Sequence, residues 1–122
     1  MQSAHLISIV DDDASMREAM REHLRSLGYA ATGYASAEEF LASTKLNETA
    51  CLITDVKMPG LSGLDLQNRL LKQGWSIPII FVTAYAEERL RKQAIDAGAA
   101  FVLDKPYQEE LLIQCLDAVL RP

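Results

Sequence analysis

Short apolar runs alternate with amphipathic stretches along the whole chain. The apolar runs predict strands near residues 6–10, 30–34, 50–54, 78–82 and 100–104. Apolar positions that recur at steps of three and four predict helices near residues 14–27, 36–44, 63–73, 87–97 and 108–120. Strands and helices that alternate in this way predict an α/β fold, in which helices cover both faces of a parallel sheet.

The apolar stripes of the predicted helices are expected to pack into the core. The stripe of the first helix consists of Met16, Met20, Leu24 and Leu27, and that of the fourth consists of Leu90, Ala94 and Ile95. Gly28 and Gly98 follow these helices and can adopt the left-handed conformation on which helices often end. The segment 30–34 is the weakest strand prediction, because its residues are small and include Gly33, which is typical of an edge strand.

The composition indicates an ordinary globular protein. With 122 residues, of which 49% are hydrophobic and 24% charged, we expect a single domain spanning residues 1–122. A net charge of −5 argues against direct nucleic-acid binding, which requires a basic surface. We see no membrane-length apolar run and no signal peptide, so we expect a cytoplasmic location. Cys51 and Cys115 fall on apolar stretches, and we interpret them as small buried residues.

Polar side chains follow several of the predicted strands. They are Asp11, Asp12 and Asp13 after the first strand, Asp55 after the third, Thr83 after the fourth and Lys105 after the fifth. In an open parallel sheet, ligands bind beyond the carboxyl ends of the strands. If the first and third strands are neighbours, we expect these side chains to form one site.

This set of side chains is suited to phosphoryl transfer. Two carboxylates about 4 Å apart repel by about 4 kcal/mol at an effective dielectric constant of about 20. The three ionised groups of Asp11, Asp12 and Asp55 therefore need a cation or a proton, and Mg²⁺ is the cation that prefers such oxygen ligands. Asp55 would be the nucleophile, while the Lys105 ammonium and the Thr83 hydroxyl would bind the phosphoryl oxygens.

Each of these residues also has an ordinary structural interpretation. Asp13 is well placed to cap the following helix. Thr83 is compatible with the end of any strand, and Lys105 with a solvated loop. Their occurrence together, at the ends of successive strands, favours a shared site.

Four motifs follow one another along the chain. They are Val10-Asp11-Asp12-Asp13, Asp55-Val56-Lys57-Met58-Pro59-Gly60-Leu61-Ser62-Gly63, Thr83-Ala84 and Lys105-Pro106-Tyr107. In this order they resemble the receiver domain of bacterial two-component response regulators, and the segment from Cys51 to Lys105 is similar to the FixJ-like group of nitrogen-fixation regulators. The resemblance covers essentially the whole chain. It implies a flavodoxin-like, doubly wound (βα)5 fold with a five-stranded parallel sheet in the order 2-1-3-4-5.

The resemblance also implies a metal site and a phosphoacceptor. Asp55 would accept a phosphoryl group from a phosphohistidine of a sensor histidine kinase. Asp12 would bind Mg²⁺ directly and Asp11 through water. The backbone carbonyl of Lys57 would complete the ligands that the protein supplies.

The other functional residues follow from the same resemblance. Thr83 and Lys105 would bind the phosphoryl group, and the peptide bond between Lys105 and Pro106 would be cis, which is rare even before proline. Lys57 and Tyr85 would flank the path of an attacking water molecule. They would set the lifetime of the acyl phosphate, unless they are merely exposed loop residues.

One position departs from the family pattern. Family members usually carry Tyr or Phe three residues before the lysine, where the ring rotates inward as the threonine moves toward the phosphoryl group. Here that residue is Val102, and the aromatic side chain is Phe101. Because side chains alternate along a strand, we expect Phe101 to face the other side of the sheet. Either the rotating switch is absent, with transmission relying on Thr83 and the loop before the fourth helix, or a bulge restores it.

Phosphorylation is expected to shift the surface formed by residues 87–97, 100–104 and 108–120. This surface carries the basic residues Arg89, Arg91 and Lys92 and the acidic residues Glu109, Glu110 and Asp117. The opposite charges could pair across a two-fold homodimer, although solvated helix faces look the same. A transcriptional output would need a DNA-binding domain outside this chain. The domain would not be an enzyme, except that it catalyses its own phosphorylation and dephosphorylation.

Two other function classes use related folds or residues. A haloacid-dehalogenase-like phosphohydrolase also uses Asp, Thr, Lys and Mg²⁺, but it would want an acid two residues after the nucleophile, where this chain has Lys57. It would also need a cap over its substrate, for which the chain has little room. A flavodoxin-like cofactor carrier would need a phosphate-binding loop after the first strand, where Asp11, Asp12 and Asp13 would repel a phosphate.

Overall fold

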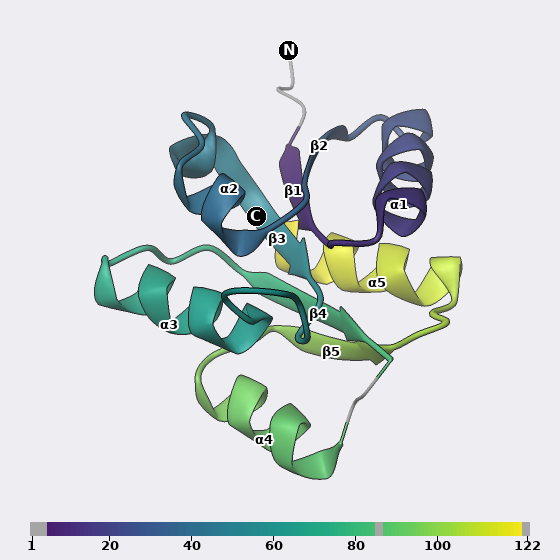
Figure 1. The fold of residues 1–122 in the computed structure, drawn as a ribbon. Coiled ribbons are helices and arrows are strands. Elements are labelled where there is room, and N and C mark those ends of the chain that lie inside the picture. The colour runs from purple at the N-terminus through teal and green to yellow at the C-terminus, as the bar shows by residue number, and fades with distance from the viewer. Residues whose placement is uncertain (1–4, 85–86, 121–122) are drawn as a thin grey trace.

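The computed structural model describes residues 5–84 and 87–120, in which strands and helices alternate (Figure 1). The strands are β1 (Leu6–Val10), β2 (Ala30–Tyr34), β3 (Thr49–Thr54), β4 (Ile79–Thr83) and β5 (Phe101–Asp104). The helices are α1 (Ala14–Ser26), α2 (Ala37–Leu41), α3 (Gly63–Lys72), α4 (Glu88–Asp96) and α5 (Glu109–Leu120), and a 3-10 turn, η1 (Leu46–Glu48), precedes β3.

The strands form one parallel sheet in the order β2-β1-β3-β4-β5. This confirms the predicted flavodoxin-like α/β topology. The order reverses between the neighbouring strands β1 and β3, which is where open α/β sheets bind their ligands. The segment predicted to be an edge strand is β2, which pairs only with β1 in the described sheet.

Each face of the sheet has its own hydrophobic core, because strand side chains alternate between the faces. In Figure 1, α1 and α5 lie on one side of the sheet, and α2, α3 and α4 lie on the other. The core under α1 and α5 includes Ile7, Ile9, Ile53, Leu24 and Leu116. The core on the opposite face includes Val10, Leu52, Phe81, Phe40 and Leu66.

Side-chain caps fix where several helices begin. Asp13 accepts a hydrogen bond from the backbone N–H of Met16 and caps α1, as its structural interpretation predicted. Ser62 and Asp65 form a reciprocal capping box at the start of α3. These two caps fix where the loop after β1 and the loop after β3 end. Both loops carry candidate site residues.

The structure corrects three local predictions. Helix α2 ends at Leu41 instead of residue 44, because the Ser43 hydroxyl accepts the backbone N–H of Lys45 and stabilises a turn in place of further helix. Leu27 is 50% exposed, since α1 has ended before it, and Ile95 is 46% exposed. Neither of these two side chains belongs to the core, although each lies on a stripe expected to be buried.

Both cysteines are free and buried, in agreement with their interpretation as small hydrophobic residues. Burial raises the pKa of the Cys51 thiol to about 12 and also raises the pKa of Cys115. At neutral pH both side chains are therefore protonated thiols. Within the described ranges, no helix combines the length and the apolar character needed to cross a membrane.

Candidate functional site

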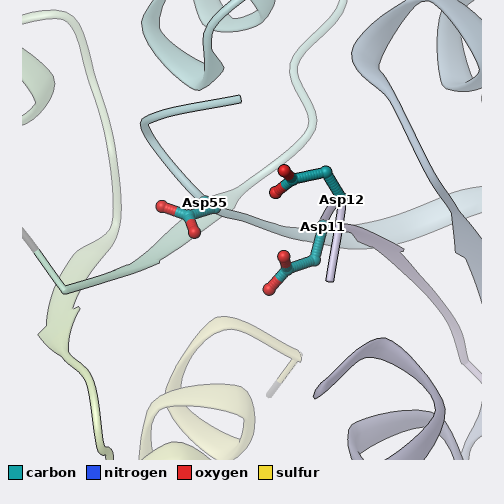
Figure 2. A group of neighbouring side chains, drawn as sticks. All are labelled: Asp11, Asp12 and Asp55. Carbon is teal, nitrogen blue, oxygen red and sulfur yellow. The ribbon is translucent and has the colours of Figure 1, made fainter. Parts of the chain in front are cut away.

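The carboxyl ends of β1 and β3 bring the acidic residues together. The backbone N–H of Asp55 donates to the carbonyl of Val10 at 3.2 Å, which continues the β1–β3 pairing to the residue after β3. The N–H of Asp11 donates to the carbonyl of Tyr34 at 3.1 Å on the other side of β1. Figure 2 shows the carboxylates of Asp11 and Asp12 extending from the end of β1 toward Asp55. The predicted convergence of these residues is confirmed.

The arrangement of the three carboxylates suits a small, hard cation. One oxygen from each of Asp11, Asp12 and Asp55 lies within 4.8 Å of the others. Asp11 is buried, Asp55 is half-buried and Asp12 is exposed, so the cluster opens to solvent on the Asp12 side. A set of oxygen ligands that is open to water on one side fits Mg²⁺, which keeps part of its hydration shell when it binds to proteins.

Lys105 joins two of these carboxylates. Its ammonium donates to Oδ2 of Asp11 and to Oδ2 of Asp55, both at 2.9 Å. The three side chains are only 15%, 9% and 13% exposed, so water screens these contacts weakly. Burial alone would lower the pKa of Lys105, but the hydrogen bonds to Asp11 and Asp55 outweigh it and raise the pKa above its ordinary value. The ammonium therefore stays charged at neutral pH.

Residues of β4 and β5 complete this edge of the sheet. Thr83 is the last residue of β4, is 1% exposed and lies opposite Asp104 of β5. The backbone N–H of Lys105 donates to the carbonyl of Thr83 at 2.9 Å, which places Lys105 directly beyond β5. The peptide bond between Lys105 and Pro106 is cis, as predicted. Tyr85, which we expected beside the site, lies outside the described residues.

The loop after Asp55 folds tightly back on itself. The backbone N–H of Lys57 donates to Oδ1 of Asp55 at 3.3 Å, and the N–H of Gly63 donates to the carbonyl of Val56 at 2.8 Å. A Cβ on Gly63 would overlap the backbone carbonyl oxygen of Asp55, so a side chain cannot be accommodated there without moving the loop. The packing of the loop that carries Lys57 thus depends on a glycine that the sequence analysis left without a role.

A family comparison adds to this geometry. The family model for the response regulator receiver domain matches residues 7–117. The chain belongs to this family. This confirms the receiver-domain resemblance, and it gives no support to the phosphohydrolase or cofactor-carrier interpretation.

Individual proteins are similar to this receiver domain over nearly its whole length. Nodulation protein W of Bradyrhizobium diazoefficiens is 40% identical over 115 residues, which cover 94% of this chain and 49% of that protein. Response regulator protein TodT of Pseudomonas putida is 39% identical over 118 residues, covering 97% of this chain and 52% of that protein. The solved structure of FixJ-N has a TM-score of 0.86 and 30% identity, and the match covers 98% of this chain and 95% of that one. The predicted similarity to the FixJ-like group is confirmed, and the receiver domain spans about half the length of these curated relatives.

The position of the usual aromatic switch in receiver domains is occupied by Val102. Val102 packs against the core under α3 and α4, whereas Phe101 packs against the core on the opposite face. The pairing of β4 with β5 keeps its register from Phe101 to Asp104, so a bulge does not bring Phe101 to the Thr83 face. The prediction that Phe101 faces away from the Thr83 side is therefore confirmed.

A different side chain connects α4 to this part of β5. Arg91 donates from Nη1 to the carbonyl of Val102 at 2.7 Å and from Nη2 to Oδ1 of Asp104 at 3.1 Å. The sequence analysis treated Arg91 only as part of a charged surface. Its two partners lie eleven and thirteen positions further along the chain, and no helix or strand period could have indicated these contacts.

Proposed function

We propose that Asp55 of this receiver domain accepts a phosphoryl group from a phosphohistidine of a sensor histidine kinase, in a reaction that depends on Mg²⁺. The observation that carries the proposal is the position of the Asp55 carboxylate, with Asp11 and Asp12 on one side and the Lys105 ammonium bound to it. A nucleophile in these surroundings has both a cation-binding set of ligands and a fixed positive charge within reach.

In the proposed reaction, an oxygen of the Asp55 carboxylate attacks the phosphorus atom of the phosphohistidine. The phosphorus–nitrogen bond breaks, its electron pair returns to the imidazole ring, and the phosphoryl group is left on Asp55. Asp11, Asp12, Asp55 and the backbone carbonyl of Lys57 would hold Mg²⁺. When bound, this ion would neutralise negative charge on the transferring group. Lys105 would exchange its contact with Asp55 for one with the phosphoryl oxygens, and the Thr83 hydroxyl would donate a hydrogen bond to them.

The phosphoryl group on Asp55 would later be lost by hydrolysis at the same site. The domain would therefore catalyse only its own phosphorylation and dephosphorylation. Lys57 is the described neighbour of Asp55 that we assign to setting the lifetime of the acyl phosphate. A cytoplasmic location goes with this function, because the phosphohistidine donor is a kinase of the two-component type.

The phosphorylated site would signal through the surface formed by α4, β5 and α5. Movement of Thr83 toward the phosphoryl group would shift a pre-existing equilibrium of this surface. Because the chain spans about half the length of its curated relatives, we assign the transcriptional output to a DNA-binding domain outside this chain. Such a domain, and not the acidic receiver domain, would contact DNA.

Treatment with acetyl phosphate, with and without Mg²⁺, tests this function. We expect the intact mass of the protein to rise by one phosphoryl group only when Mg²⁺ is present, and Asp55→Asn to abolish the increase. Asp13→Asn is the matched control, because it changes the same chemical group near the site while Asn can still cap α1. Phosphorylation that persists in Asp55→Asn, or that is independent of Mg²⁺, would contradict the proposal.

A further inference from the structure

Asp11 is held by contacts at every polar group that it offers. Its N–H donates to Tyr34, and its carboxylate accepts from the N–H of Asp13 and from the ammonium of Lys105. Its backbone carbonyl accepts a hydrogen bond of 2.7 Å from Nη1 of Arg17. The last of these contacts comes from a side chain that neither the sequence analysis nor the proposed reaction uses.

The Arg17 contact fixes the peptide unit between the first two aspartates. The carbonyl of Asp11 belongs to the peptide plane that continues into the N–H of Asp12, so a bond to this oxygen restrains both residues. The distance of 2.7 Å is in the range of short hydrogen bonds from charged donors, which are about twice as strong as neutral ones. Arg17 is half-buried on the first turns of α1, and its own N–H donates to the carbonyl of Asp13 at 3.0 Å. The restraint is therefore built into the start of α1.

The edge strand β2 supplies the surface against which the Arg17 side chain packs. A Cβ on Gly33 would lie 2.9 Å from Cγ and 3.0 Å from Cδ of Arg17. The aliphatic stem of Arg17 thus lies against the bare backbone of Gly33, where a side chain would push it away. The backbone of Gly33 does not have a positive φ, so the glycine is required for space and not for conformation. This explains a glycine in the interior of a strand, where it is otherwise unfavourable.

We propose that Arg17, seated on Gly33, is a positioning residue that orients Asp11 and Asp12 for Mg²⁺. The affinity of the site for the ion is then set partly by an edge strand that contributes no ligand. This inference rests on the proposed function, because it assumes that Asp11 and Asp12 serve a metal ion. Partners of metal ligands typically change metal affinity by about 10–100-fold when they are removed.

The sign of the effect separates positioning from simple electrostatics. The guanidinium is a positive charge close to a cation site, so its removal would by itself tighten Mg²⁺ binding. Loss of positioning has the opposite effect and weakens binding. We expect Arg17→Ala to raise the dissociation constant for Mg²⁺ on the order of 10-fold, as measured by isothermal titration calorimetry on the unphosphorylated protein. Arg17→Lys, which keeps a donor for the Asp11 carbonyl, should recover most of the affinity.

A double-mutant cycle tests the role of Gly33. Gly33→Ala should weaken Mg²⁺ binding in the parent protein, because the new methyl group displaces the Arg17 stem. In the Arg17→Ala background the same substitution should change little, because the stem is gone. Arg21→Ala is the matched control: it removes an arginine from the same helix whose partner is Glu18, and it should leave the affinity unchanged or slightly higher.

The outcomes distinguish this inference from the proposed function. If Arg17→Ala binds Mg²⁺ as tightly as the parent or more tightly, while Asp12→Asn weakens binding, Arg17 is only a structural tie and the inference is wrong. If the parent protein does not bind Mg²⁺, both the inference and the proposed function are wrong. Thermal unfolding of each variant checks that it folds. Arg17→Lys and Gly33→Ala keep the test valid if Arg17→Ala does not fold.

Discussion

Lys105 holds together two carboxylates that would otherwise repel each other. Its ammonium lies 2.9 Å from an oxygen of Asp11 and 2.9 Å from an oxygen of Asp55, among side chains that are largely shielded from water. In the absence of another cation, the Lys105 ammonium offsets the negative charge of the Asp55 carboxylate directly. A cation bound by the acidic cluster would take over part of this neutralising role.

Replacing Lys105 should therefore destabilise the protein in a way that Mg²⁺ corrects. Without Mg²⁺ we expect Lys105→Met to lose about 1–3 kcal/mol in the free energy of unfolding, because both carboxylates lose a charged hydrogen-bond partner. Added Mg²⁺ should stabilise the variant more than it stabilises the parent. Urea denaturation with and without Mg²⁺ measures both effects. Equal stabilisation of the two proteins by Mg²⁺ would show that the ammonium and the ion do not share a site.

Cys51 predicts how stability changes at alkaline pH. Burial raises its pKa from 9.0 to about 12 in the folded protein. A raised pKa means that the folded state keeps a proton that the unfolded state loses, so this contribution to stability is complete below pH 9 and is lost between pH 9 and 12. The pKa of Lys105 is also raised, and its contribution is lost in the same direction.

We expect the free energy of unfolding to fall as the pH rises above 9, with the Cys51 thiol supplying at most about 1.4 kcal/mol per pH unit. In Cys51→Ala this fall should be shallower, whatever the stability of the variant at pH 7. Urea denaturation at pH 8, 9 and 10 in a reducing buffer gives the two slopes. Identical slopes would mean that Cys51 does not remain protonated in the folded protein.

At the scale of elements, Arg91 ties α4 to β5 beside the position where receiver domains usually carry an aromatic switch. It binds the carbonyl of Val102 and the carboxylate of Asp104, so its contacts span the strand that leads into Lys105. A change at the end of β5 can therefore reach α4 through this side chain without a rotating ring.

Removing this tie should loosen α4 while leaving the sheet intact. For Arg91→Met we expect faster amide hydrogen exchange in Glu88–Asp96 and a loss of about 1 kcal/mol in the free energy of unfolding, because the contacts are partly exposed. Arg89→Met, on an exposed position of the same helix, is the control and should not accelerate exchange. Unchanged exchange in Arg91→Met would show that the Arg91 contacts do not couple α4 to β5.

At the scale of the whole molecule, the charges of the α4–β5–α5 surface are partly paired within the chain. Arg91 binds Asp104, Lys92 binds Asp96 at 3.0 Å, and Glu109 binds His23 at 3.1 Å. Arg89 and Glu110 are two exposed residues of the expected set that these contacts do not use, and they are the pair that we expect to meet between two copies. A dimer through this surface would therefore depend on few ion pairs and should be sensitive to salt.

We expect beryllofluoride with Mg²⁺ to convert the protein from monomer to dimer, and high salt to reverse the change. In that state Arg89→Glu should weaken the dimer, and Glu110→Arg in the same chain should restore it, because the swap exchanges the two charges. Sedimentation velocity at several protein concentrations measures the association. A protein that stays monomeric with beryllofluoride bound would leave these charges as solvated helix faces.

The sequence by itself determined the alternation of strands and helices and the residues at the strand ends. Both are local properties: an apolar run of strand length, or a polar residue directly after one, is visible within a few positions of the chain. The five strands accordingly lie within a residue of their predicted bounds. The family motifs then implied the order of the sheet, because those motifs belong to one fold.

The tertiary structure alone decided which side chains support these residues. Gly63 makes room for the carbonyl of Asp55, and Gly33 makes room for the stem of Arg17. Arg91 reaches the carbonyl of Val102. In each case the two residues in contact belong to different segments that meet only in the folded protein. No helix or strand period relates the one residue to the other. Local pattern can place an aspartate at the end of a strand, but only the packed fold determines what holds it in place.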